Sequence, residues 1–302
     1  MTAAGPRPGP GAPAAAGPPR VVRVLPDVPA IAKAFDYAVP DALGPEVRVG
    51  SEVRVVLGGR RVWGWVVADG VDPEPGVALR PLAAVRGWGP PPAVLEVAAW
   101  AAWRWAGPLS ILLRTASAPR VVRRLPSAPG PAPGGPPATA AVAPGPAGEA
   151  TTTVVRAGPA ADPWPWCRRA AALVGPGAGV LVLAPGQGAA RALARRWHQE
   201  GTPVALLPEE WARARAGGCV AVGTRAAAFA PLPRLAGALV LDAHDEVYHE
   251  ERSPTWCAWE VAAERARRAG VPCVLVSPCP TLDLLGRGRL VTAPRGFERG
   301  GW

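Results

Sequence analysis

The segment at residues 52–67 has the sequence EVRVVLGGRRVWGWVV. Its first half alternates apolar and polar side chains, which is typical of a half-buried β-strand. Gly58-Gly59 then marks a tight turn and the second half returns as another strand, so the segment predicts a β-hairpin. Strand-like runs also occur at residues 21–25 and 77–85. We therefore expect residues 20–108 to form a small β-rich domain that resembles a barrel or a sandwich.

A helix is predicted near the end of this domain. Residues 93–106, AVLEVAAWAAWRWA, have a helix-forming composition. Trp100, Trp103 and Trp105 fall within six positions of one another. They either pack the helix onto the β-rich domain or form a platform on which nucleic-acid bases stack, and packing is the commoner use of such residues.

Residues 151–302 follow a different pattern, in which short apolar runs alternate with helix-forming segments. Residues 180–183, VLVL, suit a parallel strand that is buried on both faces. Further strand-like runs lie at residues 204–207, 219–222, 238–241 and 273–276. Alternation of this kind predicts an α/β domain built on a parallel sheet.

The Pro and Gly residues, 40 and 36 of the 302 residues, mark segments that do not build a core. Residues 1–19 are predicted to be a disordered tail. Residues 126–150 are almost wholly Pro, Gly, Ala, Ser and Thr, which predicts a linker. We therefore place the boundary region between the two domains at residues 109–150.

The charge balance favours a polyanionic partner. Basic residues outnumber acidic ones 33 to 23, which gives a net charge of +10, and every basic residue except Lys33 is an arginine. The composition of a GC-rich genome explains the preference for arginine over lysine, but it does not explain the excess of positive charge. A net positive field attracts nucleic acid above all.

Cysteine usage and hydropathy bound the cellular setting. The five cysteines include no C-x-x-C pair, so their spacing suits neither a zinc site nor a disulfide framework. No run of 18 apolar residues predicts a membrane span, and the N-terminus lacks the pattern of a signal peptide. We expect a cytoplasmic protein without a membrane partner.

Three short motifs follow apolar runs in the α/β part. They are Gly223-Thr224-Arg225, then Asp242-Ala243-His244-Asp245, and then a segment that begins with Ser277-Pro278. Open α/β sheets place their binding sites at the carboxyl ends of the strands. We therefore expect the three motifs to lie along one edge of the sheet.

The order of these motifs, with E-R-S-P-T-W at residues 251–256 between the last two, resembles the first, RecA-like helicase lobe of the PriA family of primosomal proteins. The N-terminal part resembles the same family independently: VVRVLPDVP, FDYAVP and the hairpin segment are similar to its 3′-DNA-binding domain. The resemblance covers about residues 20–115 and 178–293.

The resemblance implies a pocket that recognises the 3′ end of a nascent DNA strand, formed here by Phe35, Asp36, Tyr37, Gly58 and Arg80. An aromatic ring can stack on the terminal base, and a carboxylate can accept a hydrogen bond from a 3′-hydroxyl. A glycine permits close approach of the backbone, and an arginine can hold a phosphate. Without the family, core packing for Phe35 and a turn or cap for Asp36 would be the simpler interpretations.

The α/β part departs from the family at its nucleotide site. A phosphate-binding loop, G-x-x-x-x-G-K-[ST], is missing, and residues 154–166, VVRAGPAADPWPW, contain no lysine. Ala243 stands where the family has its catalytic glutamate. We therefore expect no ATP hydrolysis, no cofactor, no zinc and no second helicase lobe. The residues that match degenerate helicase motifs are Gly223, Thr224, Arg225, Asp242, His244 and Ser277.

The predicted function is binding of stalled or branched replication forks at the nascent 3′-hydroxyl end, with recruitment of primosome and replication proteins and without unwinding. The alternatives are an ATP-dependent 3′-to-5′ helicase of the same family and a truncated scaffold chain. Residues 109–125 are either a remnant of the family's winged helix or a solvated basic stretch. Their arginines are Arg114, Arg120, Arg123 and Arg124.

Overall fold

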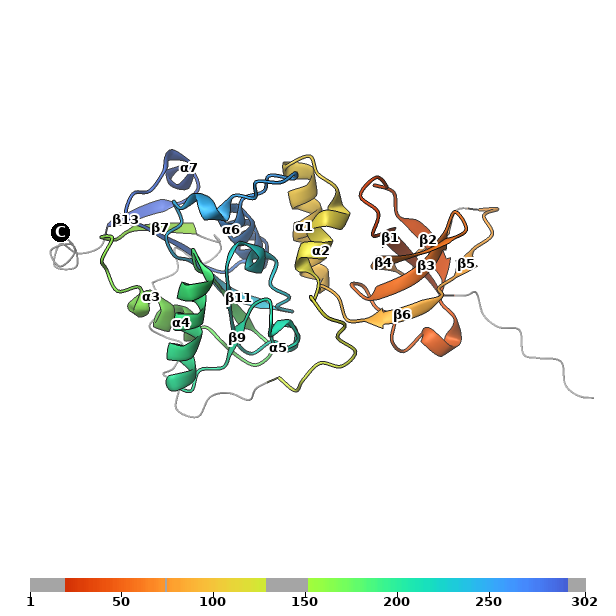
Figure 1. Cartoon of the computed structure of the whole chain (residues 1–302), viewed down its shortest axis with the longest axis horizontal. Coiled ribbons are helices and arrows are strands. Elements are labelled where there is room, and N and C mark those ends of the chain that lie inside the picture. The colour runs from red at the N-terminus through yellow and green to blue at the C-terminus, as the bar shows by residue number, and fades with distance from the viewer. Residues whose placement is uncertain (1–19, 74, 129–151, 293–302) are drawn as a thin grey trace, which may run out of the picture.

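The computed structural model describes residues 20–73, 75–128 and 152–292. These residues form a β-rich N-terminal part, a pair of helices, and an α/β part, arranged in that order along the long axis of the molecule (Figure 1). The tail predicted at residues 1–19 and nearly all of the linker predicted at residues 126–150 lie outside the described residues.

Six strands form the N-terminal sheet, in the order β5-β2-β1-β4-β3-β6. Its edge strands, β5 and β6, are separated in the chain by only Leu82 and Ala83. The amide of Leu82 donates to the carbonyl of Ala38 (3.0 Å), and the amide of Ala83 donates to that of Arg54 (2.9 Å). The sheet therefore curls until its two edges meet. Its strands are β1 Val21–Pro26, β2 Phe35–Ala38, β3 Glu52–Leu57, β4 Arg60–Asp69, β5 Arg80–Pro81 and β6 Ala84–Gly87.

Valines fill the inside of this curled sheet. The side chains of Val22, Val24, Val53, Val55 and Val66 are fully buried. They alternate along their strands with side chains on the outer surface, as the sequence pattern predicts for strands that bury one face. Burial of one face of each strand thus accounts for the sheet's curl around a small core.

The hairpin predicted at residues 52–67 is present, with β3 and β4 paired antiparallel and Leu57 opposite Arg60. Gly58 and Gly59 form its turn with φ of +54° and +78°, a region that favours glycine. The single strand predicted at residues 77–85 is wrong. The chain instead forms two short strands there, because it crosses from the β2 edge of the sheet to the β3 edge.

Two helices follow the sheet, α1 at Pro92–Arg104 and α2 at Leu109–Ala116. In α1, Trp100 packs edge-to-face against Trp105 with ring centroids 5.4 Å apart. Trp103 differs, since it is 77% exposed, so packing accounts for two of the three tryptophans. In the region where a winged-helix remnant was predicted, the described residues 109–128 contain α2 and no strand, and α2 packs on α1.

The α/β part is built on a seven-stranded sheet in the order β13-β7-β12-β11-β8-β10-β9, and all its neighbouring strands are parallel. This confirms the predicted parallel sheet. The strands are β7 Thr152–Arg156, β8 Gly179–Leu183, β9 Val204–Leu206, β10 Val220–Gly223, β11 Leu235–Val240, β12 Cys273–Ser277 and β13 Arg289–Thr292. The helices are α3 Trp164–Ala171, α4 Gln187–Gln199, α5 Trp211–Ala216, α6 Ala258–Ala269 and α7 Leu282–Leu285, with 3₁₀ turns η1 Asp41–Leu43, η3 Arg225–Phe229 and η4 Glu246–Tyr248.

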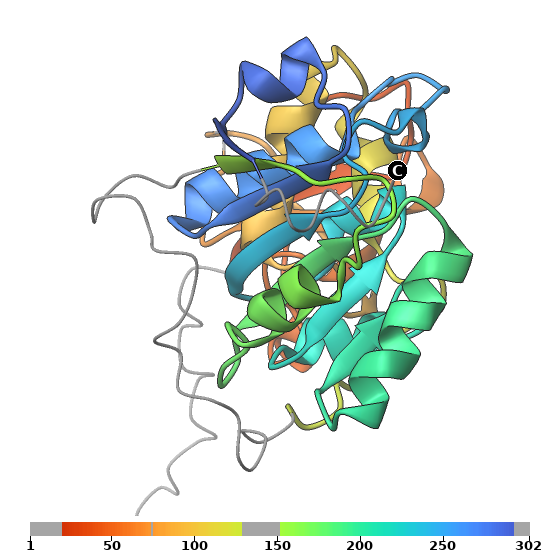
Figure 2. The same ribbon diagram turned by 90° about the vertical axis from the view of Figure 1, so that its left-hand side faces the viewer.

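The two faces of this sheet bury different partners. On one face, α3 and α4 cover Val180 and Val182 with a core that includes Trp164 and Trp197 (Figure 2). On the other face, Leu181 and its neighbours pack under α5, α6 and η3. This second core continues through α1 and α2 to Leu25 and Trp65 of the N-terminal sheet, so one hydrophobic core joins the two parts.

Specific polar contacts fix the junction. The indole Nε1 of Trp211 donates to the carbonyl of Ala116 (2.9 Å), and Nε of Arg215 donates to that of Gly89 (3.2 Å). The indole of Trp65 donates to the hydroxyl of Ser117 (2.9 Å). Gly107 lies between α1 and α2, and a Cβ added there would lie 2.3 Å from Cβ of Pro254. The connection between the two helices therefore touches the α/β part directly. The two parts are therefore held in a defined orientation.

Candidate nucleic-acid interface

Strand β2 carries three of the predicted site residues, and its alternation divides them between two faces. Tyr37 points into the core and is 4% exposed, while Phe35, two positions earlier, packs against the same core. Burial raises the pKa of the Tyr37 phenol. Asp36 lies between them and points the opposite way. Phe35 and Tyr37 are thus partly structural, as the simpler interpretation held for Phe35.

The other two predicted site residues, Gly58 and Arg80, lie near Tyr37 of β2 in different ways. Its hydroxyl donates to the carbonyl of Val56 (3.3 Å), two residues before Gly58. Arg80 of β5 is the register partner of Tyr37, and its charge acts on the Tyr37 phenol. An added Cβ at Gly58 would meet nothing within 4 Å. The positive φ of the turn, rather than a lack of space, therefore favours glycine at position 58. The surface at this turn between β3 and β4 is open.

The Asp36 carboxylate is held by Arg23 of β1. Nε and Nη2 of Arg23 donate to the two carboxylate oxygens at 2.7 and 3.0 Å. The side chain of Arg23 is 44% exposed and that of Asp36 is 17% exposed. The hydrogen bond to Asp36 raises the pKa of Arg23. Sequence reasoning missed Arg23, although a lone charge between the buried Val22 and Val24 was a usable signal.

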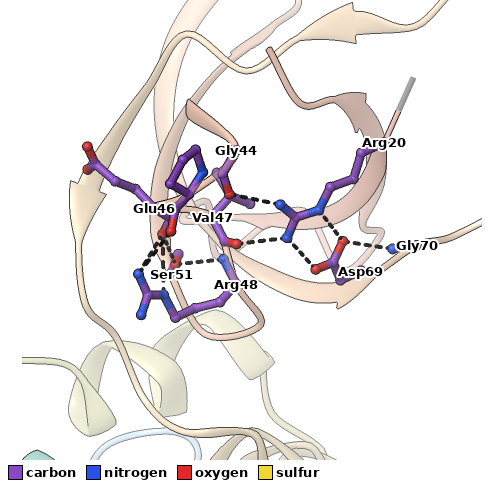
Figure 3. Close-up of polar contacts among 9 residues, drawn as sticks. Arg20, Gly44, Glu46, Val47, Arg48, Ser51, Asp69 and Gly70 are labelled. Atoms are coloured by element: carbon purple, nitrogen blue, oxygen red, sulfur yellow. Dashed lines mark hydrogen bonds and ion pairs between the residues drawn. The ribbon is translucent and has the colours of Figure 1, made fainter. Parts of the chain in front are cut away.

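A second arginine–aspartate pair is formed by Arg20, just before β1, and Asp69 at the end of β4, and it anchors the loop at residues 44–47. Arg20 holds Asp69 at 3.0 and 2.6 Å, and it also donates to the carbonyls of Gly44 and Val47, both at 2.8 Å (Figure 3). The hydrogen bond from Arg20 lowers the pKa of Asp69. The Arg23–Asp36 pair has no such loop to anchor among the described residues, so its exposed face remains open to a ligand.

The motif residues of the α/β part do gather at the carboxyl edge of the sheet. Gly223 ends β10, Asp242 follows β11, and Ser277 ends β12. Burial raises the pKa of the Asp242 carboxyl, whose backbone has a φ of +50°. The buried Ser277 hydroxyl accepts a hydrogen bond from the amide of Cys279 (3.2 Å).

Of the remaining motif residues, Arg225 is occupied by local contacts. Arg225 donates to the carbonyl of His249 (2.7 Å) and pairs with Glu250 (3.0 Å), and Thr224 precedes η3. Nδ1 of His244 is buried without a hydrogen-bond partner. These side chains therefore do not converge on one point.

Between β7 and α3, the loop at residues 157–163 borders a cavity of about 300 Å³ at this edge. Its lining is made mostly of Ala, Pro and Leu side chains, and Asp242 is the one charged residue among the described residues that line it. The Asp162 carboxylate accepts from the amide of Trp164 (3.0 Å), the first residue of α3. Pro163 and Pro165 flank that residue and supply no amide donors. The cavity thus offers an anion little positive charge.

Comparison with known proteins identifies the N-terminal part. Residues 23–118 match the family model of the PriA 3′DNA-binding domain (3′BD). This part of the chain is therefore similar to the 3′DNA-binding domain of PriA. The match runs from β1 through α2.

The PriA relatives match over a limited stretch. The chain is 38% identical over 68 residues to the Replication restart protein PriA of Bacillus subtilis, which is 22% of this chain and 8% of that protein. It is 37% identical over 65 residues to the protein of the same name from Treponema pallidum, which is 22% of this chain and 10% of the relative. The matched stretches thus span a tenth or less of each relative's length.

Two kinds of feature, a metal-binding cluster and a membrane-spanning helix, are absent from the part of the chain that the structure describes. No cluster of three or more His, Cys, Asp or Glu side chains could hold a metal ion there. No helix in the same residues is long and apolar enough to cross a membrane.

Proposed function

We propose that this chain binds the 3′ end of a nascent DNA strand at a stalled or branched replication fork. The observation that carries the proposal is the strand Phe35-Asp36-Tyr37, which lies beside Arg80 in a domain that matches the PriA 3′DNA-binding family. The net charge of +10 supports a nucleic-acid partner.

Each residue of this site has a chemical task in the proposal. The Asp36 carboxylate accepts the hydrogen bond of a terminal 3′-hydroxyl and repels a 3′-phosphate, and Arg23 holds it in place. Phe35 offers the edge of its ring to the terminal base. Arg80, which is exposed, neutralises the last phosphodiester. The test is equilibrium binding to two forks that differ only in the 3′ group, with the hydroxyl expected to bind more tightly.

We further propose that the α/β part is a RecA-like first helicase lobe whose nucleotide site has been lost. The parallel strand order and the motif residues at the carboxyl edge support the likeness. The apolar cavity, the prolines at the start of α3 and the lack of a lysine after Lys33 support the loss. Without a cation at this loop, the charge that develops on transferred phosphates has no stabiliser.

ATP is therefore expected to leave the thermal midpoint of unfolding unchanged. A ligand that binds the native state at a hundred times its Kd stabilises it by about 2.7 kcal/mol. For a chain of this size that would raise the midpoint by several degrees, at about 2–4 °C per kcal/mol. Differential scanning fluorimetry with millimolar Mg-ATP measures the shift. A rise that saturates with ATP concentration would mean that the nucleotide site is intact and would favour the helicase alternative.

In this proposal the chain acts at the fork in the cytoplasm by binding and by recruiting replication proteins, and it needs no metal or nucleotide to do so. The joined core of the two parts supports a platform of fixed shape, which a recruiting protein requires. The scaffold alternative differs in one respect, since it predicts no preference for a 3′ end.

A further inference from the structure

A basic groove of about 600 Å³ lies where the N-terminal domain meets the α/β part, away from β2. It is bounded by η1 and the loop after it, by β6, and by the segment at residues 121–124. Figure 1 shows β6 on the side of the domain that faces the α/β part, with β5 on the far side. The charged residues that line the groove are Arg48, Arg86, Arg123, Arg124 and Glu46.

Trp88 organises the inner wall of the groove. The guanidinium of Arg48 lies 3.8 Å from the centroid of its ring, and that of Arg215, from α5 of the α/β part, lies 4.9 Å from it. Burial, with a smaller contribution from Arg48, lowers the pKa of Arg215 to about 10, so Arg215 is still charged at neutral pH. Two cations thus share one aromatic ring, and an anion in the groove would relieve their repulsion.

Hydrogen bonds within the loop after η1 hold Arg48 in place. Its guanidinium Nε and Nη2 donate to the carbonyl of Glu46, both at 3.4 Å, and its amide donates to the hydroxyl of Ser51 (3.1 Å) (Figure 3). The guanidinium is therefore fixed before any ligand arrives, which lowers the entropy that binding would cost.

The opposite wall is anchored by backbone contacts. The amide of Trp88 donates to the carbonyl of Val122 (2.8 Å), and a Cβ at Gly87 would lie 2.3 Å from the same oxygen. The chain at Val122 is thus pressed against β6, and Arg123 and Arg124, both exposed, follow at once. Their position depends on a close backbone approach rather than on a helix or a strand.

The arginines of the groove outnumber the carboxylates in and beside it. Glu46 is the one acid among the described residues that line the groove, and Glu52 pairs with Arg86 (3.2 Å). The guanidinium groups of Arg86 and Arg54 also lie near the ring of Trp63, at 5.2 and 5.1 Å from its centroid. Four lining arginines against these two carboxylates leave the groove positive.

We propose that this groove binds the phosphodiester backbone of the duplex DNA that adjoins the 3′ end. Fixed guanidinium groups suit phosphate oxygens, which they can contact through two hydrogen bonds at once. The inference rests on the proposed function for its choice of DNA, but it concerns a different surface: β6, η1 and residues 123–124 line it, whereas the end-binding residues lie on β2 and β5. One DNA molecule can then contact the N-terminal domain at two places.

The test compares wild type with the double variant Arg123→Ala, Arg124→Ala. The probes are a fork with a 20-base-pair arm and a short single strand with the same 3′ terminus, measured by fluorescence anisotropy over a range of salt. We expect affinity for the fork to fall at least tenfold and the slope of log K against log salt to become shallower by about 1.8, at about 0.9 per lost phosphate contact. Affinity for the single strand should change less than twofold.

The matched control is Arg191→Ala with Arg195→Ala, which removes the same charge from the exposed side of α4. It should leave fork binding within twofold of wild type. An equal loss in the control, or an unchanged salt slope in the groove variant, would overturn the groove. A selective loss of fork binding in a protein that shows no preference for a 3′-hydroxyl would support the groove and overturn the end-binding function.

Discussion

Replacing Asp36 with alanine should abolish the preference for a free 3′-hydroxyl while leaving the affinity for internal duplex DNA close to that of wild type. A hydrogen bond to a charged group contributes about 1.5–3 kcal/mol, which corresponds to roughly tenfold to a hundredfold in affinity. Arg23 loses its partner in this variant, but its side chain is 44% exposed and water can solvate it. Dissociation constants for oligonucleotides ending in a hydroxyl or a phosphate measure the effect directly.

The structure supplies a matched control in the pair Arg20–Asp69, which has the same bidentate geometry and joins the residue before β1 to the end of β4 (Figure 3). Asp69→Ala removes one carboxylate from an arginine in the same way, and it should leave the hydroxyl preference intact. If Asp36→Ala and Asp69→Ala weaken binding to all DNAs equally, Asp36 is a structural residue and the end-binding assignment fails.

Leu113→Ala should lower the free energy of unfolding by about 2–5 kcal/mol, the range for large cavities in a packed core. Leu113 of α2 is fully buried in the core that both parts of the chain share. Because that core is continuous, the N-terminal domain and the α/β part should lose stability together. Urea unfolding followed by tryptophan fluorescence and by far-ultraviolet circular dichroism tests whether both signals shift by the same amount.

Leu282→Ala is the control for this loss. Leu282 is 87% exposed, and surface substitutions of this kind usually change stability by less than about 0.5 kcal/mol. Two separate unfolding transitions, with only one of them shifted by Leu113→Ala, would show that the two parts fold independently and that the shared core contributes little.

The fold was predictable wherever local pattern and final burial agree. The hairpin at residues 52–67 and the apolar run at residues 180–183 both bury the residues that their patterns indicate. Strand β7 and helix α3 were not predicted. They are short, they adjoin the Pro/Gly-rich segment, and α3 begins at two prolines, so nothing local distinguishes them from loop. The parallel pairing of β7 with β12, more than 100 residues away, is what makes β7 a strand.

The candidate site was predictable only in part. The family resemblance indicated Phe35, Asp36 and Tyr37, and the structure places Arg80 next to Tyr37. The charge of Arg23 between two valines was visible in the sequence, but its pairing with Asp36 was not, because that contact joins two strands. The contact of Arg215 with Trp88 was further out of reach, since it depends on how the two parts pack. Patterns along the chain reveal faces of strands and helices, whereas contacts between elements require the fold.

The most direct measurement of the central claim is fluorescence anisotropy on a model fork whose leading strand ends at the junction in either a 3′-hydroxyl or a 3′-phosphate, at one fixed salt concentration. Salt must be held constant because contacts with phosphates make affinity depend steeply on it. We predict at least tenfold tighter binding of the hydroxyl fork, since the Asp36 carboxylate accepts a hydrogen bond from the hydroxyl and repels the phosphate. Equal binding of the two forks would contradict the end-binding function and leave a basic protein that contacts DNA through its backbone alone.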